Sequence, residues 1–131
     1  MGKTLLKNVK MVNENAIMEG DLLLEGQFIL KISGDISEPN AKVIDLKGKY
    51  LFPGIIDDQV HVREPGLTHK GNIATESRAA IAGGITSFME QPNTNPQTTT
   101  IEELEKKFAI AANSAYANYS FLFGGTNDNL E

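Results

Sequence analysis

The fold follows from one stretch, Phe52-Pro-Gly-Ile-Ile-Asp-Asp-Gln-Val-His-Val-Arg-Glu-Pro-Gly66, which combines an apolar run, alternating polar side chains and two Pro-Gly turns. Successive side chains of a β-strand point to opposite faces. The pattern therefore predicts a strand over residues 54–62 with one apolar face and one polar face. A strand that offers a carboxylate, an amide, an imidazole and a guanidinium on one face is suited to present a functional site. That face would carry Asp57, Gln59, His61 and Arg63.

Strand and helix patterns alternate after this stretch. Asn72 is expected to cap a helix that runs to Ala82 and stops at two glycines. A strand over 85–90 follows, then a helix that opens at the capping box Thr100-x-x-Glu103, then a strand over 119–123. Short connections between these elements predict a parallel sheet with right-handed crossovers. The charged residues of the second helix are expected to form a solvated face: Glu102, Glu103, Glu105, Lys106 and Lys107.

The residues before this stretch are predicted to form an all-β module that contains no obvious functional site. Short apolar runs over 5–12, 21–25, 28–32, 42–46 and 50–52 predict five strands, and Gly26-Gln27 predicts a tight hairpin turn. The expected domains are therefore a β portion over 1–52 and an α/β portion over 53–131. A complete (β/α)8 barrel needs about 250 residues, and only 79 follow Phe52 (131 − 52). We expect a fragment of a larger α/β protein, with a compact three-stranded domain as the alternative.

The composition excludes several classes of protein. The chain is 40% hydrophobic and 22% charged, and its net charge of −5 argues against nucleic-acid binding. It has no cysteine, and therefore neither disulfides nor thiolate metal sites. No signal peptide and no apolar run long enough for a bilayer is visible. We expect a cytoplasmic protein with neither a nucleic-acid nor a membrane partner.

Polar residues follow each of the three strands of the predicted parallel sheet, over 59–63, 90–95 and 124–129. Ligand sites in parallel α/β folds lie at the carboxyl ends of the strands. His61 could bind a metal through a neutral ring nitrogen. Arg63 presents a planar fork suited to a carboxylate, and Asn93 could contact the same anion.

These residues resemble a known family. The segment Asp57-Asp-Gln-Val-His-Val-Arg-Glu-Pro-Gly66 is similar to the Asp-x-His-x-His-x-Arg-Glu-Pro-Gly segment of dihydroorotases, in the metal-dependent amidohydrolase superfamily. Further similar segments occur in the same order: Thr68-His-Lys70, Arg78-Ala-Ala80, Ala82-Gly-Gly-Ile-Thr86 and Pro92-Asn-Thr-Asn-Pro96. The Arg-Glu-Pro-Gly run favours dihydroorotase over dihydropyrimidinase and allantoinase.

The resemblance implies the amino-terminal portion of a TIM-barrel hydrolase, preceded by part of a small β-sandwich. It implies that His61 is a metal ligand and that Arg63 and Asn93 hold the substrate carboxylate. Apart from the resemblance, two roles stay open for Asp57: it orients a ligand through a hydrogen bond, or it simply caps the end of the strand. One or two zinc ions would activate water for the reversible hydrolysis of dihydroorotate to carbamoyl aspartate in pyrimidine biosynthesis. The full-length protein would form a homo-oligomer. The remaining ligands and the general acid/base would come from later strands, so this piece alone is expected to be inactive.

Gln59 departs from the family pattern, because it stands where the family's first histidine binds metal. An amide oxygen is a weaker zinc ligand than imidazole. Three interpretations stay open: a dihydroorotase with a modified metal site, a catalytically silent homologue that acts as a scaffold, or an enzyme for another cyclic amide.

Overall fold

The computed structural model describes residues 2–129 of the chain. The chain separates into two compact units, Met1–Pro53 and Gly54–Glu131. In the described residues, no helix is both long and apolar enough to cross a membrane.

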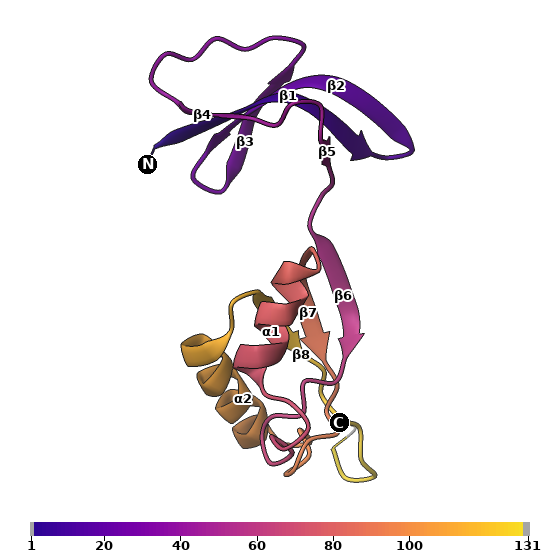
Figure 1. Cartoon of the computed structure of the whole chain (residues 1–131). Coiled ribbons are helices and arrows are strands. Elements are labelled where there is room, and N and C mark those ends of the chain that lie inside the picture. The colour runs from indigo at the N-terminus through magenta and orange to yellow at the C-terminus, as the bar shows by residue number, and fades with distance from the viewer. Residues whose placement is uncertain (1, 130–131) are drawn as a thin grey trace. The chain divides into compact units, whose positions relative to one another are not determined.

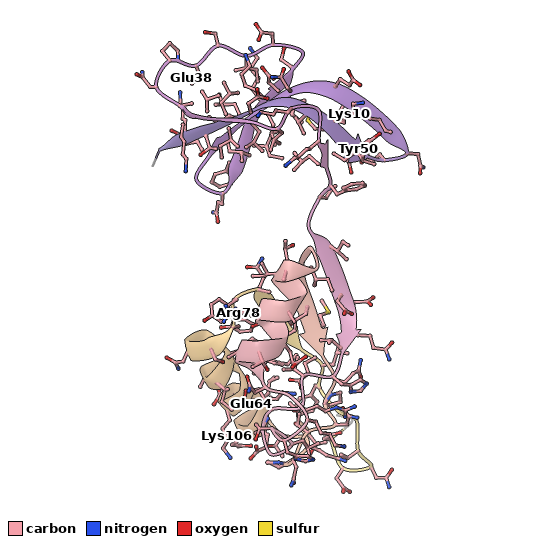
Figure 2. The ribbon with its side chains drawn as sticks, viewed as in Figure 1. Lys10, Glu38, Tyr50, Glu64, Arg78 and Lys106 are labelled. Carbon is pink, nitrogen blue, oxygen red and sulfur yellow. The ribbon has the colours of Figure 1, made fainter. Side chains whose placement is uncertain are left out.

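The first unit is a five-stranded sheet. The order is β3-β2-β1-β4, with β5 also paired to β1; β1, β2 and β3 are antiparallel, whereas β4 and β5 run parallel to β1. All five predicted strands are confirmed, although the second begins earlier than expected. Gly26 has a positive φ of 58° between the paired residues Glu25 and Phe28, as a two-residue hairpin turn requires. The strands are β1 (Lys3–Asn13), β2 (Ala16–Glu25), β3 (Phe28–Ser33), β4 (Lys42–Asp45) and β5 (Tyr50–Leu51). Figure 2 shows Lys10 of β1 beside Tyr50 of β5, with its ammonium 5.6 Å from the ring centre.

A bulge in β1 is held by a buried carboxylate. The register with β2 shifts between Leu6 and Val9, and Asn8 there has a φ of 54°. Asp21 is 2% exposed and accepts hydrogen bonds from the backbone N–H groups of Asn8 (3.0 Å) and Ile36 (2.9 Å). Burial opposes its charge, but these bonds and Lys7 together hold the pKa of Asp21 below its usual value.

The second unit is a βαβαβ arrangement. Its three strands are parallel, as predicted, and lie in the order β6-β7-β8, and both helices cover the same side of the sheet (Figure 1). Buried residues from the sheet and both helices form its core: Val62, Ile73, Phe88, Ala111, Ala117 and Phe121. The elements are β6 (Ile55–Val60), α1 (Ile73–Ala82), β7 (Ile85–Glu90), α2 (Ile101–Ser114) and β8 (Asn118–Phe121).

Local rules place both helices where the sequence predicted them. Asn72 forms a reciprocal capping box with Thr75 at the start of α1, and Gly83 caps its end. The Thr100 side chain accepts the N–H of Glu103 at the start of α2. Glu64 adds a carboxylate to the N-terminus of α1, where it accepts the N–H of Ile73 at 2.8 Å (Figure 2).

Candidate functional site

Three loops gather at the end of the second unit toward which its parallel strands run (Figure 1). The loop after β6 contacts the loop after β7, because the N–H of Asn95 donates to the carbonyl of Pro65 at 3.2 Å. The loop after β8 is tied to the same region by Asn129, whose amide group donates to the carbonyl of Thr99 at 2.9 Å. The polar segments that follow the three strands in the sequence therefore lie at one edge of the sheet.

The structure brings His61 and Asn93 together. Nδ1 of His61 lies 2.8 Å from Oδ1 of Asn93, and both side chains are exposed. Oδ1 can only accept, so this contact is a hydrogen bond when Nδ1 carries the ring proton; a neutral ring in that tautomer has a free lone pair on Nε2. This is the tautomer that a neutral histidine uses to bind a metal through Nε2. The amide group of Asn93 keeps its own two donors for a further acceptor.

Arg63 lies beyond the strand rather than on it. The prediction that the strand extends to residue 62 is wrong, because β6 ends at Val60. Arg63 has a φ of 79°, which is uncommon for a side chain other than glycine. Its backbone N–H donates to Oε1 of Glu90 at 2.8 Å. Its side chain is half-buried, and within residues 2–129 its guanidinium forms no ion pair.

Asp57 does not share a face with the other predicted site residues. The register between β6 and β7 shifts between Asp57 and Val60, and this irregularity breaks the expected alternation. Asp57 lines a cavity of about 280 Å³ together with Val60, Val62 and residues of α1. Its Oδ1 accepts the backbone N–H of Gln59 at 3.1 Å. The side chain of Gln59 is exposed at the end of the strand.

Sequence reasoning missed a buried ion pair behind these loops. Glu90 at the end of β7 and Lys107 of α2 are each about 1% exposed, with Oε2 and Nζ 3.0 Å apart. The prediction that Lys107 belongs to a solvated helix face is wrong; its neighbour Lys106 is exposed (Figure 2). Burial raises the pKa of Glu90, although the positive charge of Lys107 partly offsets this effect. Burial likewise lowers the pKa of Lys107, although the negative charge of Glu90 partly offsets it.

Two periodicities could have indicated this pair. Glu90 is two residues after the buried Phe88 on a strand, and therefore points to the same face. Lys107 stands three residues after Leu104 and four before Ala111, on the face of α2 that packs against the core. An acid and a base at matching buried positions indicate an internal pair.

The described residues do not complete a metal site. Within residues 2–129 no group of three or more His, Cys, Asp and Glu side chains is placed to hold an ion. Zinc usually takes three or four protein ligands, and His61 supplies one. The chemistry of His61 therefore fits one ligand of such a site, but these residues alone do not fit a zinc ion.

Comparison with known proteins agrees with this architecture. The family described as Dihydro-orotase-like matches residues 48–123. A dihydroorotase of Carboxydothermus hydrogenoformans is 46% identical over 89 residues, which cover 68% of this chain and 21% of that protein. A dihydroorotase of Lactobacillus leichmannii is 43% identical over 106 residues, which cover 81% of this chain and 25% of that protein.

Solved structures extend the likeness to the whole chain. The L-hydantoinase (dihydropyrimidinase) from Arthrobacter aurescens matches 99% of the chain with a TM-score of 0.92 and 32% identity, and the match covers 29% of that structure at its amino-terminal end. The chain thus spans about a quarter of the length of the relatives it matches. The family match over more than half of the residues shows that the chain belongs to the dihydroorotase-like family of cyclic amidohydrolases.

Proposed function

We propose that this chain supplies the first part of the active site of a dihydroorotase, which hydrolyses the cyclic amide of dihydroorotate reversibly. The observation that carries the proposal is the contact of His61 with Asn93, which unites two loops distant in sequence. His61 presents Nε2 for a metal, and the nearby loop residue Arg63 presents a guanidinium. Dihydroorotate offers the matching groups, because it carries a carboxylate beside its cyclic amide.

Each residue then has a separate task. Arg63 forms paired charge-assisted hydrogen bonds to the carboxylate, and the amide group of Asn93 donates to the same anion. His61 would be one ligand of a zinc ion, which supplies Lewis-acid activation when it is bound. The other ligands would lie in parts of the protein that this chain does not include, so we expect the isolated chain to show no turnover.

Two other functions predict different results. A hydantoinase-type enzyme, favoured by the structural match to L-hydantoinase, would act on cyclic amides without a carboxylate. Arg63 would then contribute little to the rate. A catalytically silent scaffold, favoured by Gln59, would show no turnover with any substrate.

A chimera tests the proposal. Residues 1–131 would replace the matching amino-terminal part of the Lactobacillus leichmannii dihydroorotase, and hydrolysis of dihydroorotate would be measured with and without a chelator. We expect activity that the chelator abolishes. Arg63→Met should lower kcat/KM for dihydroorotate by about 100-fold, since a charged hydrogen-bonded contact contributes roughly 1.5–3 kcal/mol.

Arg78→Met is the matched control, because Arg78 is an exposed arginine of α1 (Figure 2) and should leave the rate unchanged. Equal losses from both substitutions would contradict the role of Arg63. Faster turnover of hydantoin than of dihydroorotate would favour the hydantoinase. An inactive chimera that Gln59→His restores would instead favour the silent scaffold.

A further inference from the structure

One carboxylate links the loops that carry the candidate site residues. Oε1 of Glu90 accepts the backbone N–H of Arg63 at 2.8 Å, which fixes the loop after β6. Oε2 of Glu90 lies 3.0 Å from Nζ of Lys107, and that ammonium donates to the carbonyl of Gln91 at 3.2 Å, in the loop after β7. Both loops are therefore tied to the same buried pair.

Stability alone does not account for such a pair. Removing two charges from water is costly, and buried ion pairs can often be replaced by apolar side chains of similar volume with little loss of stability. The two groups here contribute directional contacts that apolar side chains lack. The counter-charge of Oε2 is the Lys107 ammonium, 3.0 Å away.

The backbone of Arg63 needs such a partner. Its φ of 79° lies in a region that side chains other than glycine rarely adopt, and such conformations persist only where surrounding contacts hold them. The N–H of Leu67 donates to the carbonyl of Arg63 at 3.1 Å, and Glu90 accepts its N–H. These two bonds satisfy both backbone groups of Arg63 in this conformation.

We propose that Glu90 is a positioning residue for the site: by accepting the N–H of Arg63, it fixes where the Arg63 side chain and the adjacent His61 stand relative to Asn93. Lys107 makes this possible, because it neutralises the carboxylate inside the core and holds the neighbouring loop through Gln91. The inference about catalysis rests on the proposed function, whereas the placement of the loop does not.

Two double variants of the 131-residue chain separate positioning from stability. Both remove the charges of the pair. Glu90→Gln/Lys107→Met keeps an oxygen that can accept the N–H of Arg63, whereas Glu90→Met/Lys107→Met removes it at similar volume. Hydrogen exchange of single backbone amides, measured by NMR, compares the two. The amide of Gln91, which donates to the carbonyl of Val60 at 2.9 Å, is the internal control for an intact sheet.

We expect the Arg63 amide to exchange about tenfold faster in the methionine variant than in the glutamine variant, with the Gln91 amide equally protected in both. The Nδ1 resonance of His61 should move only in the methionine variant. Equal exchange of the Arg63 amide in both variants would overturn the proposal. If the methionine variant does not fold, loss of Arg63 protection in the folded glutamine variant would overturn it as well. No substrate enters this measurement, so its failure is distinct from an inactive chimera.

Discussion

Gly66 determines how closely the two site loops approach each other. It has a φ of 80°, and a Cβ added there would overlap the carbonyl oxygen of Asn95 and lie 2.8 Å from the carbonyl carbon and Cβ of that residue. These are backbone atoms or atoms next to the backbone, which cannot rotate away. We therefore expect Gly66→Ala to force the loop after β6 away from the loop after β7.

The magnitude follows from two contributions. A left-handed φ at a residue with a Cβ costs about 1–2 kcal/mol. Overpacking against a rigid neighbour costs about 1–3 kcal/mol. The free energy of unfolding of the second unit should therefore fall by about 2–5 kcal/mol. The loops must separate by about 1.5–2 Å for the added Cβ and the carbonyl oxygen of Asn95 to reach van der Waals distance, which is enough to weaken the 2.8 Å contact of His61 with Asn93.

Chemical denaturation followed by NMR measures both effects, because the signals of the second unit can be tracked separately. The matched control is Gly84→Ala. Gly84 lies in the same unit and has a φ of 93°, but a Cβ there would meet open space. Gly84→Ala should lower the free energy of unfolding only by the conformational contribution of about 1–2 kcal/mol, and it should leave the His61 ring signals unchanged. If the two alanine variants were equally stable, with unchanged His61 signals in both, the close approach at Gly66 would be refuted.

Two further predictions concern buried charges. Lys107→Met leaves the Glu90 carboxylate buried without its cation, and should reduce the free energy of unfolding by about 3–5 kcal/mol. The control Lys106→Met removes only an exposed pair and should cost less than about 1 kcal/mol; similar losses would contradict the buried pair. Asp21→Asn replaces one of two acceptors with a donor that faces a backbone N–H, so it should cost about 1–3 kcal/mol at pH 7. Because the folded pKa of Asp21 is lowered, its contribution is present above the ordinary value of 3.8 and is lost as the pH falls through the folded pKa. The denaturation curves of the native chain and the variant should converge below about pH 3.8; a constant difference down to pH 2 would argue against an ionised Asp21.

The sequence predicted those parts of the fold that depend on local chemistry. Asn72 and Thr100 cap helices because their side chains accept a hydrogen bond from the backbone N–H three residues further along the chain. Gly26 indicates a hairpin because a two-residue turn needs a residue with a positive φ, and glycine adopts that conformation readily. The sequence also predicted that the segments carrying His61 and Asn93 lie at one edge of the sheet, because both segments follow parallel strands whose carboxyl ends share that edge.

The irregularity in β6 could not be predicted in the same way. Strict alternation places Asp57 with Gln59, but the observed register places it with Val60 and Val62. A register shift depends on how β6 pairs with β7, and no residue of β6 alone encodes it. The alternation thus predicted that Gln59 is exposed at the end of the strand, whereas it placed Asp57 on the wrong face and Arg63 on a strand that ends at Val60.

The burial of Lys107 shows why charge on a helix is a poor guide by itself. A run of acidic and basic residues usually marks a solvated face, and Lys106 follows this rule. Lys107 departs from it because its side chain meets Glu90 at the end of β7, and this contact between distant residues arises only in the packed structure. The same carboxylate then reaches the backbone of Arg63. The buried pair of Glu90 and Lys107 therefore helps to position the loops of the candidate site. The pair can be predicted from the sequence only when the strand and helix periodicities are considered together.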